Sequence, residues 1–455
     1  MCHSCSAQQQ SFVLLTLDCR QSTIQALTSR MSSLSQRAAK VFPGGKYTRW
    51  PLQQLAYGPS FLKRGDGCRV WDAETGDEYI DFMCGFGASV LGYNHPEVEA
   101  AAAAQTRCGA TLTGPTERSI ELAERVVGLR PGAEWAIFGK NGTDATLSAK
   151  IAARAATGRT TILRESSQPA GHGNPHWAYH GAQQWLRGAP GVLSSESSSV
   201  EIGYVYNDLA SVERALEQAA GDCAAIFAGG ASYPYSALTE PPTAEFARGL
   251  RSLADKHGCM LVLDEIRTNF RVGKSVQGNH WTDLSELADA SDVAPDMYCM
   301  CKAIANGHPI AALVGNAAAR DGAAAITASG TFWLSGGPMS AALATLDVLA
   351  ADNSAAMGHV QSMGRMLTAG LEEQAARHGV GVTTCGPDAM PFMTFDADAE
   401  QAVERPLGHR WCAAVADKGV WLHPHHNWYL SLSHSAEDIA QALDTTEAAF
   451  ASLKQ

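Results

Sequence analysis

The stretch MLVLDEIRTNFRVG (Met260–Gly273) places a carboxylate directly after four apolar residues. A short continuous apolar run is typical of a strand that is buried on both faces, as in a parallel sheet. Asp264 would then lie at the carboxyl edge of the sheet, where ligands bind in open α/β folds. A carboxylate buried there needs a positive partner, such as a protonated ring nitrogen, a metal ion or an arginine. The alternative is that Asp264 only caps the next turn, and the local sequence favours neither interpretation.

Two further apolar runs, Ala224–Ala228 and Ile310–Val314, predict strands of the same buried parallel kind. Ala-rich stretches with helical spacing alternate with them, including Pro115–Leu129 and Gly142–Ala156. This alternation predicts an α/β fold, with a large, mostly parallel sheet covered by helices on both faces.

The remaining segments indicate a second, smaller α+β unit. Alternating residues on either side of Thr75–Asp77 predict a hairpin over Cys68–Phe82. A long helix is expected to begin within Ser340–Leu349, and a terminal helix is expected over Glu437–Leu453. We expect four regions, which are a flexible tail (1–40), the first part of the small domain (41–87), the large cofactor domain (88–335) and the rest of the small domain (336–455).

Composition excludes several classes of protein. The 455 residues are 45% hydrophobic and 18% charged, as in globular proteins, and the formal net charge of -12 disfavours nucleic acid and anionic membranes as partners. No apolar stretch approaches the roughly 20 residues of a membrane-spanning helix. The 12 cysteines are scattered and include a single C-x-x-C spacing, Cys2–Cys5, with no second one to pair with it, so we expect reduced thiols and a cytoplasmic location. Residues 1–30 are Ser-rich and nearly free of acids, so an organelle transit peptide is the alternative.

Lys302 is the second candidate for chemistry. It lies between Cys301 and Ala303 in the stretch DMYCMCKAIANGHP (Asp296–Pro309). Apolar surroundings lower the pKa of a lysine and leave a nucleophilic amine that can form a Schiff base. An edge lysine that extends to water is the alternative, and local sequence alone favours it.

The stretch KNGTDA (Lys140–Ala145) is expected to open a helix, which would place Gly142 and Thr143 at a positive helix end that can hold a phosphate. Gly85–Gly87 lacks the third glycine of a dinucleotide motif, and Gly273–Ser275 lacks the earlier glycine of a Walker A loop. We interpret two groups of histidines as coincidences of composition and expect no metal site; the groups are His172, His176, His180 and His423, His425, His426.

Together these segments resemble the class-III aminotransferases of pyridoxal-phosphate fold type I, and in particular the branch that contains glutamate-1-semialdehyde aminomutase. The resemblance runs from about Phe42 to Phe450, and nine motifs occur in the order found in the family. They are PGG (Pro43–Gly45), VWDAETGDEYIDF (Val70–Phe82), LGYNHPEV (Leu91–Val98), TGPTE (Thr113–Glu117), NGTDAT (Asn141–Thr146), YNDL (Tyr206–Leu209), LDEIRTNFRVG (Leu263–Gly273), CKAIANGHPIAALVG (Cys301–Gly315) and SGTF (Ser329–Phe332).

The resemblance implies pyridoxal 5'-phosphate as the cofactor and assigns roles to individual residues. Lys302 matches the lysine that forms the Schiff base with the cofactor, and Asp264 matches the carboxylate that pairs with its pyridinium nitrogen. Ile266 and Tyr179 match the residues that pack on the two ring faces, although His172-Gly173 is a competing alignment for Tyr179. Gly142 and Thr143 would hold the phosphate. Thr331 resembles a threonine that reaches the phosphate from a neighbouring subunit, which implies a homodimer with shared active sites.

The implied activity is amino-group transfer between a small amino compound and a keto or aldehyde acceptor. An intramolecular 2,1-aminomutase of the glutamate-1-semialdehyde type or a lyase would use the same Lys302 and Asp264, and a non-catalytic binding relative is the alternative from another class. The substrate side departs from the family, because Gly229-Gly230 replaces the usual Glu-Pro pair. Arg49 lies near the position of the aminomutase's carboxylate-binding arginine, and His426 lies where an acid would support that arginine. Both are candidates for contact with the substrate.

Overall fold

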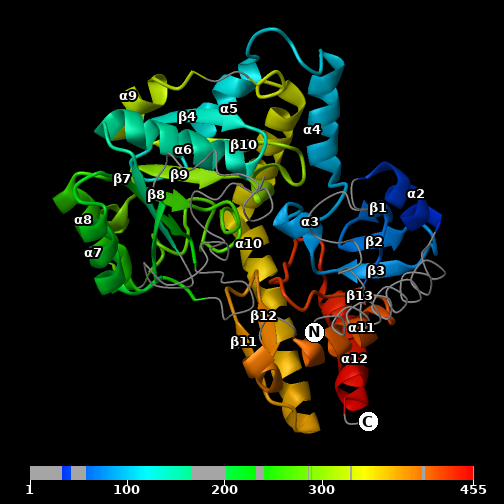
Figure 1. Cartoon of the computed structure of the whole chain (residues 1–455). Coiled ribbons are helices and arrows are strands. Elements are labelled where there is room, and N and C mark those ends of the chain that lie inside the picture. Colours follow the sequence, from blue (N-terminus) through cyan, green and yellow to red (C-terminus); the bar gives the residue numbers. More distant parts are fainter. Residues whose placement is uncertain are drawn as a thin grey trace, which may run out of the picture.

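The computed structural model describes residues 33–42, 58–165, 201–231, 240–284, 286–287, 289–327, 330–401 and 405–453. Within these ranges the chain forms a large helix-covered sheet and a smaller α/β layer, which are joined by one long helical segment (Figure 1). The bounds of the four regions expected from the sequence remain a prediction. No described helix combines the length and apolar character needed to cross a bilayer.

The large sheet has seven strands in the order β4-β10-β9-β8-β7-β5-β6. Their bounds are β4 Trp135–Gly139, β5 Thr161–Glu165, β6 Glu201–Tyr204, β7 Cys223–Gly229, β8 Met260–Asp264, β9 Met297–Met300 and β10 Ala311–Gly315. The three apolar runs of the sequence are confirmed as β7, β8 and β10, and every residue of β7 and β10 is buried.

One detail of the strand prediction is wrong. β10 is buried as expected, but it runs antiparallel to both of its neighbours, β9 and β4, whereas β9, β8, β7, β5 and β6 pair in parallel. Continuous apolar character reports burial on both faces and carries no information on strand direction, so the run at 310–314 could not distinguish the two pairings.

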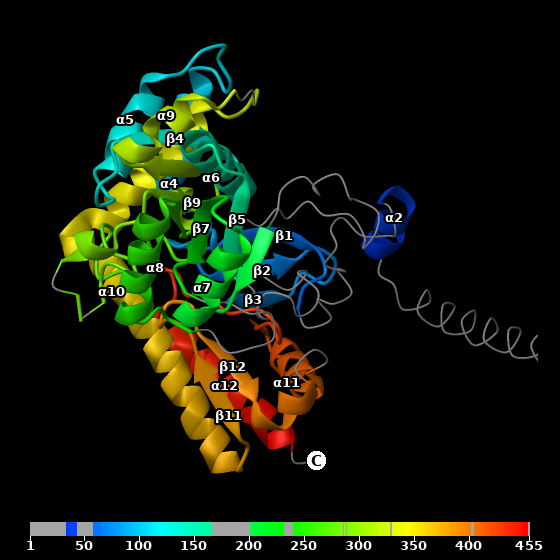
Figure 2. The ribbon, with the colours of Figure 1, turned by 60° about the vertical axis from the view of Figure 1, so that its left-hand side comes forward.

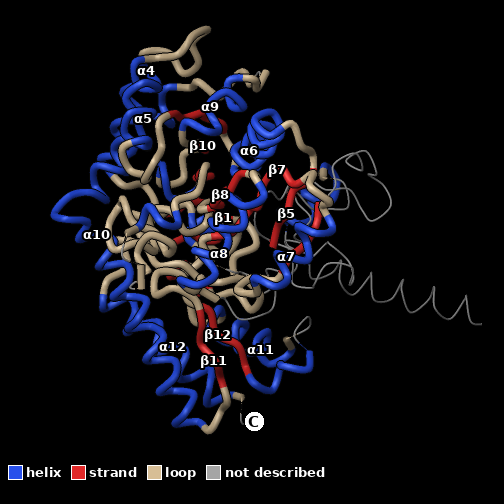
Figure 3. Tube along the Cα trace, turned by 90° about the vertical axis from the view of Figure 1, so that its left-hand side faces the viewer, coloured by secondary structure: helices blue, strands red, loops and turns tan. Residues whose placement is uncertain are grey.

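Helices cover both faces of the large sheet (Figure 3). On one face, α6 (Gly142–Thr157) and α9 (Ala317–Ala324) pack together over a core that contains Ala149, Phe227 and Val262. The other face carries a larger core with Phe246 and Leu250, to which the α10 segment (Gly336–His378) and four further helices contribute. These four helices are α4 (Pro96–Arg107), α5 (Glu117–Val127), α7 (Leu209–Gln218) and α8 (Ala244–His257). The predicted helices at 115–129 and 142–156 are thus confirmed as α5 and α6.

The smaller layer is built from both ends of the chain (Figures 1 and 2). Its sheet has the order β1-β2-β3-β13, where β1 is Leu62–Asp66, β2 is Arg69–Asp72, β3 is Glu78–Asp81 and β13 is Val420–Trp421. β2 and β3 pair antiparallel around the predicted Gly76 turn, which confirms the hairpin. β13 joins the sheet parallel to β3, and a shared core unites Ile80 with Trp411 and Phe450.

The α10 segment (Gly336–His378) connects the two layers. Its first part packs on α4 and its second part on α12 (Ala436–Ser452), which confirms the expected long helix and the terminal helix. The helix is interrupted at Asp352, Asn353 and Ser354, which all have positive φ values, and Ala351 is extended. The remaining described elements are α2 (Ser33–Val41), α3 (Cys84–Gly87), α11 (Pro406–Ala416), β11 (Val382–Cys385), β12 (Phe392–Phe395) and the short 3-10 turns η4 (Ala290–Val293), η5 (Lys302–Ala305) and η6 (Asp396–Gln401).

Candidate active site

Parallel pairing brings the two strongest candidates to the same edge of the large sheet. Asp264 ends β8 and lies in register with Cys299 of β9, and Lys302 follows β9 after Cys301. On the other side of β8, Asp264 is in register with Gly229 at the end of β7. The carboxyl ends of three neighbouring strands therefore gather Asp264, Lys302 and the Gly229-Gly230 pair, as expected for a ligand site in an α/β sheet.

Lys302 is held in a strained and enclosed position. Its φ of 49° lies in the left-handed region, which a residue with a side chain rarely occupies. Its Nζ donates a hydrogen bond to the carbonyl oxygen of Phe86 at 2.7 Å. Burial lowers the pKa of this amine below its usual value, and the nearby Arg267 cation acts in the same direction while Tyr429 opposes it. The surroundings thus shift the balance toward the neutral, nucleophilic amine.

Phe86 lies in a turn for which the sequence predicted no functional part. Gly85 and Phe86 both have positive φ values, and the residue at which the chain enters this turn is held by Tyr429, whose amide donates to the Phe82 carbonyl at 2.7 Å. A Cβ on Gly87 would lie 2.4 Å from the Tyr429 ring, so no larger residue fits there without a shift. Gly85–Gly87 was excluded as a nucleotide motif, and its observed part is to present a carbonyl oxygen to Lys302.

Asp264 makes the local contact that its alternative interpretation predicted. Its Oδ1 accepts a hydrogen bond from the Ile266 amide at 3.0 Å, so the carboxylate does order the turn after β8. A carboxylate has two oxygens and several acceptor sites, so this bond is compatible with a second, positive partner. Capping and ligand binding are therefore not exclusive at this residue.

The turn after β8 is anchored by a fully buried ion pair. Glu265 accepts a hydrogen bond from Arg130 Nε at 2.7 Å, and both side chains are 0% exposed. Arg130 also donates to the carbonyls of Leu129 and Val276, so the pair ties the end of α5 to the segment that carries Asp264.

Because this pair is buried, we expect Glu265→Ala to reduce the free energy of unfolding by about 3–5 kcal/mol, since it leaves the Arg130 charge uncompensated. Thermal melting of the variant beside wild type measures the loss. The control Arg130→Met/Glu265→Leu removes both charges and should recover most of the stability. A melting temperature equal to wild type for Glu265→Ala would show that the pair does not hold this segment.

The start of α6 lies close to the same group of residues. A Cβ on Gly142 would lie 2.6 Å from Ile266 Cδ1, so Gly142 is in close contact with the side chain that follows Asp264 and Glu265. The Cys301 thiol, next to Lys302, also interacts with the Gly142 amide. Asp144 accepts hydrogen bonds from the amides of Lys140 and Asn141, which fixes the loop before the helix. Gly142 and the neighbouring Thr143 can thus present a positive helix end to an anion beside Lys302.

The loop after β13 adds His426 to the site. Its ring lies 5.6 Å from the Phe86 ring, edge to face, and 5.8 Å from the Tyr429 ring. Arg267 was not among the site residues predicted from the sequence, and its Nη1 donates to Asn427 Oδ1 at 3.3 Å. Arg267 stands inside the motif that contains Asp264, and an arginine so close to a candidate carboxylate was the signal that could have marked it.

Close packing explains why glycines occupy the end of β7. A Cβ on Gly230 would lie 2.4 Å from Thr268 Oγ1, and the Gly230 amide donates to the Asp264 carbonyl. The Gly229 carbonyl accepts from the Tyr206 hydroxyl at 2.9 Å. The backbone of this pair is therefore pressed against the turn after β8, where a larger side chain would not fit.

The structure gives less information on the other predicted site residues. Tyr179 and Arg49 lie outside the described residues, and Thr331 lies on an exposed segment shortly before α10. Among the described residues, no group of three His, Cys, Asp or Glu side chains is placed to hold a metal ion. Of the first group of histidines, none is described, while His425 of the second group contacts His409, with 2.6 Å between their Nε2 atoms.

Comparison with known proteins identifies the family. Residues 53–450 match the family model of the class-III aminotransferases. This chain belongs to that family. It is 39% identical over 429 residues to the aminopentol aminotransferase of Sphingopyxis macrogoltabida, covering 93% of this chain and 94% of the relative. It is 30% identical over 440 residues to the glutamate-1-semialdehyde 2,1-aminomutase of Roseiflexus castenholzii, covering 92% of this chain and 97% of the relative.

A solved structure supports the same assignment. The FumI protein of Sphingopyxis sp. MTA144, in its pyridoxal-phosphate internal aldimine form, superposes with a TM-score of 0.82 at 38% identity, covering 94% of this chain and 97% of that chain. The predicted fold class is therefore confirmed as an α/β fold of pyridoxal-phosphate fold type I. This class-III aminotransferase is a pyridoxal-phosphate-dependent enzyme that acts on amino and carbonyl compounds. Its partly buried lysine, edge carboxylate and nearby helix end have the donor and acceptor chemistry that this cofactor requires.

Proposed function

We propose that this class-III aminotransferase moves an amino group between two separate small molecules, with Lys302 as the residue that attaches the cofactor. The observation that carries the proposal is the position of the partly buried Lys302, whose amine has a lowered pKa and bonds to Phe86 at the edge where Asp264 ends its strand. A surface lysine that extends to water would have neither a partner carbonyl nor a shifted pKa.

The other residues are proposed to act on the cofactor by simple contacts. Asp264 would hold a proton on the ring nitrogen, because a carboxylate stabilises the charged form of a neighbouring base. Ile266 would pack on one ring face and Tyr179 on the other. Gly142 and Thr143 would bind the phosphate through the start of α6.

Bound pyridoxal phosphate supplies an electron sink for the carbanion of the substrate and carries the amino group between the two half-reactions. The part of Lys302 is then proton transfer. Its Nζ would remove the proton from the amine-bearing carbon of the substrate and later return it, which requires a neutral amine. The lowered pKa of Lys302 supports this role, because it increases the share of neutral amine at a given pH.

Transfer between separate molecules is favoured over intramolecular transfer by two observations. The relative at 39% identity is named an aminotransferase, while the aminomutase relative is 30% identical. His426, at the position expected for an acid in the aminomutase branch, is a neutral residue, because burial holds its pKa well below the usual range. The substrate side therefore differs in charge from that branch.

The proposed enzyme is a homodimer in which Thr331 reaches the neighbouring active site. Exposed apolar side chains on the same segments as the proposed phosphate contacts support this arrangement, namely Leu147 and Ile151 of α6 and Phe332 beside Thr331. Sedimentation velocity on the purified full chain measures the mass, and a monomer at working concentration would contradict the proposal. The nine described cysteines are all free, which supports a cytoplasmic location.

Absorbance of the protein loaded with pyridoxal phosphate tests the function. We expect an amino donor alone to convert the cofactor fully to its amine form, and an added keto acid to restore the starting spectrum. Steady turnover should require both substrates. Turnover of an amino aldehyde without any keto acid would indicate the aminomutase, release of ammonia would indicate a lyase, and failure to take up the cofactor would indicate a binding relative.

A further inference from the structure

His426 lies one residue away from the reactive amine. The Phe86 carbonyl accepts the hydrogen bond from Lys302 Nζ, and the ring of the same Phe86 meets the His426 ring edge to face. His426 belongs to the loop between β13 and α12, which comes from the small layer, whereas Lys302 belongs to the large sheet. The two layers therefore face each other here across Phe86.

The hydrogen bonding of His426 fixes which ring nitrogen carries the proton. Its Nδ1 lies 2.7 Å from the carbonyl oxygen of Asn427, and a carbonyl can only accept a hydrogen bond. Nδ1 is therefore the donor. Burial lowers the pKa of His426 well below its usual range, and the charges of Arg267, His423 and Lys302 act in the same direction, while the Asn427 bond opposes them. The ring is neutral, so Nε2 must carry a lone pair and accept hydrogen bonds.

Nε2 is the atom that remains available. It makes no hydrogen bond within the described part of the chain, and it is not among the described polar atoms that are fully enclosed without a partner. The side chain as a whole is half-buried. An acceptor that is fixed, neutral and still accessible next to the reactive amine can bind a donor group of a substrate.

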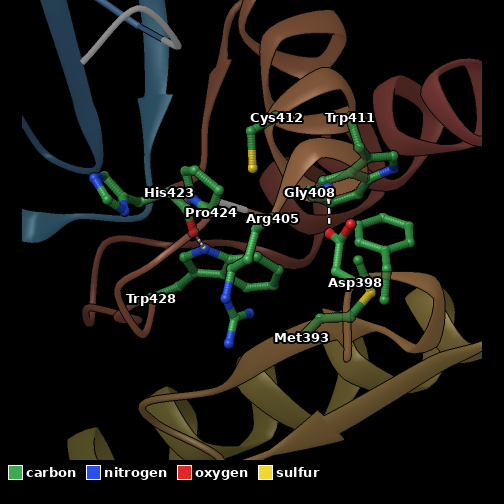
Figure 4. A pocket seen from close by; sticks show the side chains of 10 residues that line it. Met393, Asp398, Arg405, Gly408, Trp411, Cys412, His423, Pro424 and Trp428 are labelled. Atoms are coloured by element: carbon green, nitrogen blue, oxygen red, sulfur yellow. Dashed lines mark hydrogen bonds between the residues drawn. The ribbon is translucent and has the colours of Figure 1, made fainter. Parts of the chain in front are cut away.

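The loop that carries His426 is rigidly held. The Trp428 indole donates to the His423 carbonyl at 3.0 Å, and this bond closes the loop (Figure 4). Asn427 donates to the Trp428 carbonyl and accepts from Arg267. Arg267 thus bonds to the residue next to His426, and its charge acts on both His426 and Lys302, so this guanidinium with its N–H donors lies in the same region as the acceptor Nε2.

A hydroxyl group fits a site that offers both an acceptor and donors, because it can donate one hydrogen bond and accept others. A carboxylate can only accept, so it would place its lone pairs against that of Nε2. We propose that His426 is a specificity-determining residue that accepts a hydrogen bond from a hydroxyl of the amino substrate, so that this site selects amino alcohols. The inference rests on the proposed function, since it needs the amine of the substrate to react beside Lys302.

Three matched amines test the inference, because they differ in one substituent. They are 1-amino-2-propanol, isobutylamine and 3-amino-2-methylpropanoate, which carry a hydroxyl, a methyl and a carboxylate group at the same carbon. Each is joined to pyridoxal phosphate and reduced to a stable secondary amine, and its binding to the apoprotein is measured by titration calorimetry. We expect the hydroxyl conjugate to bind about tenfold more tightly than the methyl conjugate, as one net hydrogen bond of about 1.4 kcal/mol implies.

The variant His426→Phe keeps an aromatic ring beside Phe86 but removes the acceptor. We expect the preference for hydroxyl over methyl to fall to about one, and His426→Gln, which restores an acceptor, to recover part of it. Binding of the methyl conjugate to both variants serves as the control for a folded site. Rates of cofactor conversion with the three free amines in the loaded enzyme should follow the same order.

Two results would overturn the inference while leaving the proposed function intact. One is equal binding of the hydroxyl and methyl conjugates to wild type, or a preference that survives in His426→Phe. The other is tightest binding of the carboxylate conjugate, which would make the Arg267 side of the site an anion site. Failure of all three conjugates and of pyridoxal phosphate itself to bind would instead refute the proposed function.

Discussion

Lys302→Ala is expected to lower kcat/KM for amino transfer by about 10⁴-fold or more, which is the largest effect we expect from any single change. The variant loses the amine that attaches the cofactor. The same amine is the base that moves the substrate proton, so one substitution removes two functions. The measurement is steady-state turnover with saturating donor and acceptor. Borohydride treatment followed by peptide mapping should label Lys302 in wild type and no residue in the variant.

Lys302→Arg is the matched control, because it keeps a long side chain with a donor for the Phe86 carbonyl at the same place. Arginine cannot lose its proton in a protein and is a poor nucleophile, so the control should be as inactive as the alanine variant. Both variants should melt close to wild type. Retention of more than about a tenth of the activity by either variant would contradict the assignment of Lys302.

The lowered pKa of Lys302 gives this prediction a pH dependence. The neutral amine is the attacking form, so the rate at which the apoprotein attaches pyridoxal phosphate should rise with pH. Its midpoint should lie below the value of about 10.4 for an ordinary lysine, because burial favours loss of the proton. A midpoint at or above that value would show that the amine is not desolvated as the structure indicates.

The sequence predicted the elements of the fold better than their directions. The apolar runs of β7, β8 and β10 signalled burial correctly, because burial on both faces requires such runs. The reversed direction of β10 depends on its pairing with β4 and β9, which are distant in sequence, so no local pattern could reveal it. The pairing of β13 with β3 was hidden for the same reason, since two residues make a strand too short for any periodicity.

The residues of the candidate site also fall into two groups, those that could be predicted from the sequence and those that could not. Asp264 and Lys302 could be singled out because each stands at the end of an apolar run, where a charged residue needs an explanation. Phe86 could not, because its contribution is a backbone carbonyl that a left-handed turn directs toward Lys302. The hydrogen bond of Nδ1 to the Asn427 carbonyl, which decides the chemistry of His426, likewise depends on loop geometry that residue types do not encode.

Asp264→Asn is expected to lower kcat/KM by about 10³-fold while the fold and the turn after β8 stay intact. The amide oxygen can still accept the hydrogen bond from Ile266, so the local structure keeps its cap. The amide has no charge with which to keep the ring nitrogen of the cofactor protonated, and loss of a buried opposite charge costs about 3–5 kcal/mol. Such a cost corresponds to about 10²- to 10⁴-fold in rate.

Asp321→Asn, an exposed position on α9, removes the same charge away from the site and should leave turnover unchanged. Melting temperature and pyridoxal-phosphate affinity separate the two possible roles of Asp264. A purely structural cap predicts normal rates in Asp264→Asn, because its hydrogen bond survives, whereas a partner of the ring nitrogen predicts slow turnover at a nearly normal melting temperature. Rates within about threefold of wild type would therefore leave Asp264 as a cap alone, and the ring nitrogen of the cofactor would need a different partner.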